Sequence, residues 1–172
     1  MSGFEEEYER QIEEARARAT ARGRGDVLDY IQLKSANDRE RARAVSWLIE
    51  TFTALAGELD RTGAGLALAL TEAHRFRVGN STMTGERLVL KRGVRALTVE
   101  AGWPRAPRDG IVRGGGLACA RVGHFGDRKG DEELLLVPSD TDTPRWHFVE
   151  KSGARTELQE ERLRRHVVRL LD

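Results

Sequence analysis

The hydrophobic period of this chain changes once, from helical spacing before Gly65 to a two-residue alternation after it. The helical part has a wide apolar face formed by Val45, Leu48, Ile49, Phe52, Leu55, Ala56 and Leu59. The alternating part carries, on one parity, Leu66, Leu68, Leu70, His74, Phe76 and Val78, and Glu72 breaks the series, so it predicts one long or bulged strand. A helix through Leu70 is an alternative. Helices followed by strands predict an α+β fold.

The first predicted helix spans residues 4–21. Its apolar stripe, which includes Phe4 and Tyr8, is narrow, and glutamates and arginines occupy the other faces. Because packing supplies most of the stability of such a helix, it needs a partner surface. We therefore expect residues 1–62 to form an acidic helical region that docks a protein partner or self-associates.

A break at residues 22–25 and a short helical turn at 26–34 are predicted before the second long helix. That helix is expected to begin at Asn37, because Asn37 and Glu40 match a capping box.

Residues 63–172 are predicted to form an antiparallel sheet of about five to seven strands with a C-terminal helix packed on it. Arg92 and Gly93 form a tight hairpin, and short connections favour antiparallel neighbours. The helix is expected to be capped by Thr156, with Gln159 at the capping-box position. Besides residues 66–78, the strand candidates are 87–91, 94–100, 111–112, 117–125, 134–137 and 146–149.

Charge is unevenly distributed along this nearly neutral chain. Residues 61–125 hold eleven Arg or Lys and four Asp or Glu, a net charge of +7, whereas residues 1–60 and 126–172 have net charges of −4 and −2. Clustered cations raise the local potential. The sequence therefore predicts a basic Arg/Gly-rich surface of sheet and loops for an anionic partner. Its cations are Arg75, Arg77, Arg87, Lys91, Arg92, Arg95, Arg105, Arg108, Arg113 and Arg121.

The loop from Trp103 to Gly110 is a candidate binding element, because two prolines stiffen it. Arg105 and Arg108 offer guanidinium groups to phosphates or carboxylates, and Trp103 can stack on a base. The alternative is a strand-connecting turn whose Trp103 packs on the core.

Three neighbouring residues, Arg113, Gly114 and Gly115, form a second candidate. Glycines let an anion approach backbone amides closely, but these residues match neither a P-loop nor a dinucleotide-binding pattern. The alternative is a bulge or flexible turn.

Further candidates are Arg75 and Arg77, which share one face of a strand, and His124. A nucleophilic pair of Cys119 and His124 would require a third orienting group, and a buried inert thiol is the alternative for Cys119. The four histidines lack metal-binding spacing, so neither a metal nor a cofactor is predicted.

Three functions remain open at this stage. The first is a non-catalytic interaction module or accessory subunit of an intracellular complex, in which the helices dock a protein and the basic surface binds an anion. The second is a nucleic-acid-binding protein, and the third is a small enzyme acting on an anionic substrate. A single cysteine, no signal-peptide pattern and no apolar run of membrane-spanning length favour a cytoplasmic protein without a membrane partner.

Overall fold

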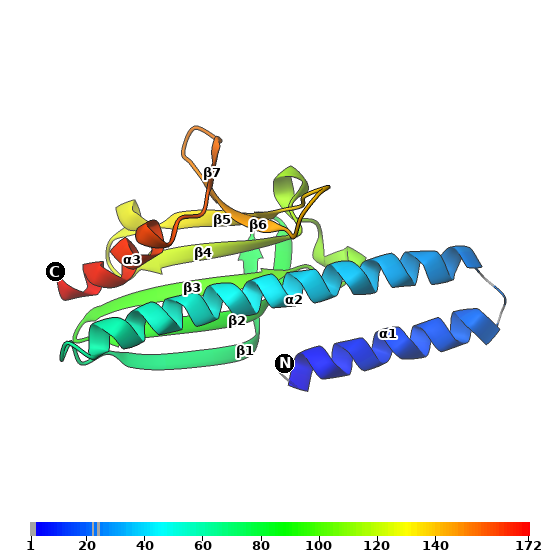
Figure 1. Ribbon diagram of the computed structural model, residues 1–172, viewed down its shortest axis with the longest axis horizontal. Helices are drawn as coiled ribbons and strands as arrows, with labels where there is room; N and C mark the ends of the chain where they lie inside the picture. Colours follow the sequence, from blue (N-terminus) through cyan, green and yellow to red (C-terminus); the bar gives the residue numbers. More distant parts are fainter. Residues whose placement is uncertain (1–2, 22, 24) are drawn as a thin grey trace.

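The computed structural model describes residues 3–21, 23 and 25–172. Two long helices, α1 (Gly3–Ala21) and α2 (Gly25–Asp60), precede a seven-stranded antiparallel sheet, and helix α3 (Glu160–Val168) follows it. Figure 1 shows this order along the colour gradient. The α+β arrangement predicted from the sequence is confirmed.

Helix α2 is longer than predicted, because it runs unbroken through Asn37. The predicted helix start at Asn37 is therefore wrong. The segment before Asn37 is stabilised by α1, since the ammonium group of Lys34 contacts both the Tyr8 hydroxyl and the carboxylate of Asp38. Arg41 donates to the same carboxylate at 2.9 Å and continues the contacts along the helix. In the predicted break, Arg22 and Arg24 lie outside the described residues.

The strands form a meander in which each strand pairs with the next along the chain. The predicted hairpin is confirmed, because Arg92 pairs with Arg95 and Gly93 has a φ of 60°. The bounds are β1 (Ala67–Val78), β2 (Ser81–Arg92), β3 (Arg95–Trp103), β4 (Ala118–His124), β5 (Glu132–Val137), β6 (Arg145–Val149) and β7 (Arg155–Glu157).

Two local predictions are wrong. Residues 111–112 lie between the 3-10 turns η1 (Pro107–Asp109) and η2 (Arg113–Gly115), where the Ser81 hydroxyl bonds both the amide and the carbonyl of Ile111. Thr156 pairs with Phe148 in β7 instead of capping α3, whose N-cap is Gln159.

A bulge in β1 exchanges the two faces of that strand. The register with β2 shifts between Thr71 and His74, and Ala73 has a φ of 52°. Because side chains alternate along a strand, one extra residue moves the following ones to the other face. Leu70 therefore lies on the face that carries the helices, whereas Phe76 packs with Met83 and Cys119 on the opposite face.

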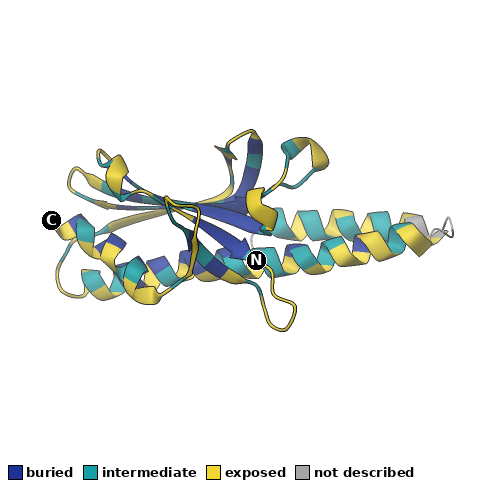
Figure 2. Ribbon diagram, turned by 90° about the horizontal axis from the view of Figure 1, so that it is seen from above, coloured by how far each residue is buried: buried dark blue, intermediate teal, exposed yellow. Residues whose placement is uncertain are grey.

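One hydrophobic core joins α2 and α3 to one face of the sheet (Figure 2). Phe52 and Leu48 of α2 and Leu163 of α3 are completely buried. The indole of Trp146 in β6 donates to the carbonyl of Ala44 at 3.0 Å, which holds α2 against the far strands. Helix α1 and the N-terminal part of α2 extend beyond the sheet as a two-helix arm (Figures 1 and 2).

Candidate functional site

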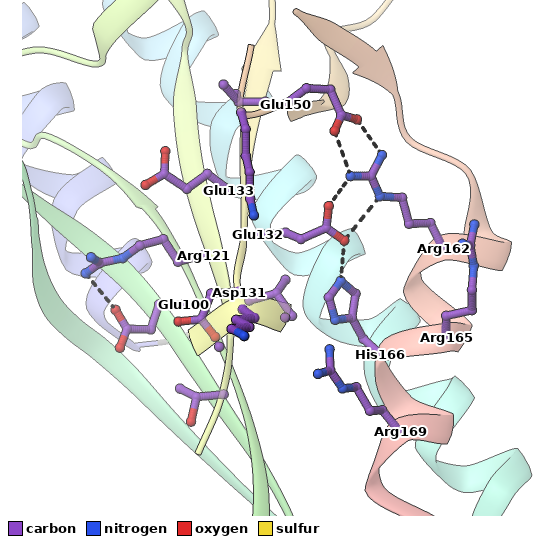
Figure 3. A pocket seen from close by; sticks show the side chains of 17 residues that line it. Glu100, Arg121, Asp131, Glu132, Glu133, Glu150, Arg162, Arg165, His166 and Arg169 are labelled. Carbon is purple, nitrogen blue, oxygen red and sulfur yellow. Dashed lines mark hydrogen bonds and ion pairs between the residues drawn. The ribbon is translucent and has the colours of Figure 1, made fainter. Parts of the chain in front are cut away.

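A hollow of about 990 Å³ lies between the central strands β3–β5 and helix α3 with the turn that follows it. Figure 3 shows two walls: Glu100 and Arg121 project from the sheet, whereas Arg162, Arg165, His166 and Arg169 project from α3 and the following turn. The lining is dominated by charged side chains of both signs. These are Glu100, Arg121, Lys129, Asp131, Glu132, Glu133, Glu150, Lys151, Arg162, Arg165, His166 and Arg169.

Arg162 orders the α3 wall. Its Nη1 lies 2.6 Å from Glu150 Oε1 and its Nε lies 3.1 Å from Glu132 Oε1. The guanidinium carbon is 4.0 Å from the ring centroid of Phe148, so the group is also stacked. The hydrogen bonds that Arg162 donates to Glu150 and Glu132 raise the pKa of Arg162. The two carboxylates neutralise its charge and fix its position.

A chain of hydrogen bonds continues from Glu132 through two buried histidines. His166 Nε2 lies 2.7 Å from Glu132 Oε1, and His166 Nδ1 lies 2.8 Å from His124 Nε2. Burial lowers the pKa of both histidines, and their proximity further lowers that of His124. Because an ionised carboxylate only accepts, neutral His166 carries its hydrogen on Nε2 and accepts at Nδ1 from His124. Although burial opposes it, bonds from Arg162 and His166 lower the pKa of Glu132.

Three exposed cations on the hollow have no acidic partner within ion-pair distance in the described part of the chain: Lys129, Lys151 and Arg165. They differ from Arg121, which lies 3.6 Å from Glu100, and from Arg169, which pairs with Asp127. The lining also holds the carboxylates of Asp131 and Glu133. Asp131 accepts the backbone amide of His124 at 2.9 Å.

The predicted pair Trp103 and Arg105 lies at the base of the arm, not on an open loop. Trp103 is buried in the core, and the Arg105 guanidinium carbon lies 3.5 Å from its ring centroid. Arg105 donates to both oxygens of Glu5, at 2.9 and 3.1 Å, and to the carbonyl of Thr84. These contacts fasten α1 to the sheet.

The other predicted cations are scattered. Arg75 lies 3.7 Å from Asp109, whereas Arg77 and Arg108 have exposed side chains. The carbonyl of Arg77 accepts from Arg121 at 2.8 Å.

In the glycine-rich turn, the contacts are made by the backbone. Gly114 and Gly115 have φ values of 72° and 74°, and the Gly114 carbonyl accepts from Arg155 at 2.6 Å. The exposed Arg113 packs its guanidinium group over Gly79 in the β1–β2 turn.

Cys119 and His124 lie on opposite faces of β4, because their register partners are Gly102 and Leu97. Burial raises the pKa of Cys119 to about 12, and the thiol packs with Phe76 and Met83. Cys119 is therefore the buried thiol that was the alternative to a nucleophile. His124 is the predicted site residue that contacts the α3 wall, through His166.

The predicted site omitted the cations of α3, although a signal for them exists in the sequence. The basic residues of α3 and the following turn are spaced one, three or four positions apart, which places them on one side of a helix: Arg162, Arg165, His166 and Arg169. Their position beside the central strands depends on the packing of α3 and cannot be read from spacing.

A comparison of the chain with known protein families, with curated proteins and with solved structures finds no match. Among the described residues, no three His, Cys, Asp or Glu side chains are placed to hold a metal ion. No helix in the described ranges is both long and apolar enough to cross a membrane.

Proposed function

We propose that this protein is a non-catalytic interaction module, an accessory subunit that holds an anionic group of its partner in the hollow beside α3. The observation that carries the proposal is the set of three exposed cations on the hollow that have no acidic partner among the described residues, Lys129, Lys151 and Arg165. They come from three different segments and meet at one hollow, so the fold itself gathers them.

The electrostatics of the hollow favour an anion at its rim. Arg162 is already neutralised by Glu132 and Glu150, and Arg121 lies beside Glu100. The three remaining cations outnumber the lining carboxylates that have no ion pair within the described part of the chain, which are Asp131 and Glu133. Because all three cations are exposed, a single ion pair with one of them contributes at most about 1 kcal/mol, so measurable binding requires an anion that contacts several of them at once.

A binding role also agrees with the state of the reactive groups. The Cys119 thiol is buried and carries a raised pKa, so little nucleophilic thiolate exists at neutral pH. The hydrogen bonds of His124 and His166 connect them to each other and to Glu132, where they hold α3 against the sheet.

The test measures binding of a fluorescent single-stranded oligonucleotide and of inorganic polyphosphate at low and high salt. The triple variant K129E/K151E/R165E should lose binding, because it reverses the unpaired charges. A second triple variant, R75E/R108E/R113E, reverses three of the exposed cations predicted from the sequence and should retain binding. Both proteins should keep the circular dichroism spectrum of the wild type.

The results separate the proposals. Polyphosphate binding that weakens with salt and depends on the first triple variant supports an anion site in the hollow. Loss of binding only in the second triple variant would place the anion site instead at β1 and the turns of Arg108 and Arg113. Tighter binding of the oligonucleotide than of polyphosphate at equal charge favours the nucleic-acid alternative, and no binding of either probe contradicts the proposed site.

A further inference from the structure

The arm exposes two large apolar side chains on one side of α2. Tyr30 is 63% exposed and Leu33 is 64% exposed, whereas Ile31, which faces α1, is buried. The packing of α1 against α2 therefore leaves this side uncovered. Exposed aromatic and aliphatic groups on a projecting helix are typical of a surface that packs against another helix.

The same helix borders an apolar groove of about 370 Å³ on the sheet domain. Its apolar lining consists of Ala44 and Trp47 of α2, Pro144, Trp146 of β6 and Leu158. The remaining lining residues are polar or charged: Glu40, Arg43, Thr143, Arg145 and Glu157. Trp47 is 47% exposed, although the groove lies next to the hydrophobic core.

The arm side chains and the groove lie on one stripe of α2. Residues 30, 33, 37, 40, 44 and 47 alternate spacings of three and four, which keeps them on one side of a helix. Tyr30 and Ala44 are fourteen residues apart, about 21 Å at 1.5 Å per residue. Each copy of the chain therefore carries both an apolar knob and, at a fixed distance, a groove to receive one.

This arrangement is self-complementary under a two-fold axis. If two α2 helices pack antiparallel with Asn37 at the axis, Tyr30 of each copy meets Ala44 and Trp47 of the other. Leu33 then meets the segment around Glu40. A closed two-fold interface uses the same patch on both partners, which is the property this stripe has. A polar Asn at the centre of such a helical seam favours one register.

Charge complementarity supports the same register. Asp29, beside Tyr30 on the arm, is exposed and lies within ion-pair distance of no cation among the described residues. Arg43 borders the groove and is also exposed, and its ion-pair partner among the described residues is Glu40 of its own helix, at 3.1 Å. Antiparallel packing about Asn37 brings Asp29 of one copy close to Arg43 of the other.

We propose that two copies of this chain associate through reciprocal docking of the arm of each into the Trp47 groove of the other. This interface lies on α2 and β6, away from the anion-binding hollow beside α3, and does not depend on the proposed function.

The experiment determines the mass of the full chain by sedimentation equilibrium over a range of concentrations. The wild type should behave as a dimer. The variant Y30D/L33D should weaken the dimer by roughly thirtyfold or more, because it places charges at the apolar centre of the interface. The control V94D/I111D changes two apolar residues that are 90% and 75% exposed elsewhere, and it should leave the mass unchanged.

A charge exchange tests the register. D29R and R43D should each weaken the dimer, and the double variant D29R/R43D should recover part of the loss, since the pair is restored with reversed sign. Thermal melting of each variant shows that it remains folded. A monomeric wild type at all concentrations overturns the proposal, and so does a dimer that Y30D/L33D leaves intact. Failure of this test leaves polyphosphate binding unaffected, so the two proposals fail separately.

Discussion

Acidification should destabilise the protein through the buried pair of His124 and His166. Both histidines have a lowered pKa in the folded state, whereas the unfolded chain titrates near the ordinary value of 6.5. Below that value the unfolded state binds more protons, so stability is present above pH 6.5 and is lost as the pH falls toward the folded pKa. Below the folded pKa values the loss levels off.

The structure sets the size of the effect. One proton taken up on unfolding changes stability by about 1.4 kcal/mol per pH unit, so two histidines give at most about 2.8 kcal/mol per pH unit. The first proton can be accommodated: His166 then donates from Nδ1, and His124 accepts at Nε2 with its hydrogen on Nδ1. A second proton would set two N–H groups against each other across 2.8 Å. The slope should therefore approach the upper limit only over a narrow range.

The neighbouring charges act in both directions on this pair. Arg169 lowers the pKa of both histidines, while Asp131 and Asp127 raise that of His124 and Glu132 raises that of His166. Burial remains the leading cause for both, so the direction of the prediction stands.

The assay is urea unfolding followed by circular dichroism between about pH 5 and about pH 8, a window that brackets the ordinary histidine pKa. The variant H124Q/H166Q should lose most of the pH slope above pH 5, whereas H147Q, outside the pair, should retain it. A wild-type slope near zero between pH 5 and 6.5 would refute the reasoning. So would an unchanged slope in H124Q/H166Q.

Three further perturbations test the packing. Arg105→Ala should weaken docking of α1 by about 3 kcal/mol, because it removes the buried ion pair between Arg105 and Glu5, and hydrogen exchange should accelerate in α1 while the sheet amides stay protected. Gly85→Ala should lower the unfolding free energy by about 1–3 kcal/mol in thermal melts, since its Cβ would overlap the carbonyl oxygen of Ala101 in the adjacent strand. A thiol reagent at neutral pH should leave Cys119 unmodified in the folded protein and modify it in urea, because burial raises its pKa to about 12.

The fold class could be predicted because hydrophobic period is a local property. The apolar face of α2 from Val45 onward and the alternation after Gly65 each follow from neighbouring residues. The bulge in β1 was also visible, as an interruption of the alternation at Glu72. The start of α2 could not be predicted from the sequence, because contacts with α1 stabilise residues 25–34 and the polar Asn37 is compatible with a helix interior.

The candidate site was less predictable, because its members are brought together by packing. In sequence, Trp103 and Arg105 resemble part of an exposed recognition loop. In the fold, Trp103 is buried in the core and Arg105 is paired with the distant Glu5, so both residues stabilise the structure. The partners of Glu132 are Arg162 and His166, about thirty residues further along the chain. No local pattern relates residues at that separation.

The net charge of a segment is a poor guide to the surface potential of an antiparallel sheet. Across the sheet face opposite the helices, Arg87 lies beside Glu100 in register, Glu100 lies beside Arg121, and Arg121 lies beside Glu133. Opposite charges on neighbouring strands stabilise the pairing and cancel each other at a distance. Two cations of residues 61–125 face acids outside that segment, since Glu133 lies beside Arg121 in register and Glu5 binds Arg105. Arg92 and Arg95 donate to backbone carbonyls near the C-terminus. The unpaired cations that converge on one hollow come instead from α3 and from two turns, in the part of the sequence whose net charge is negative.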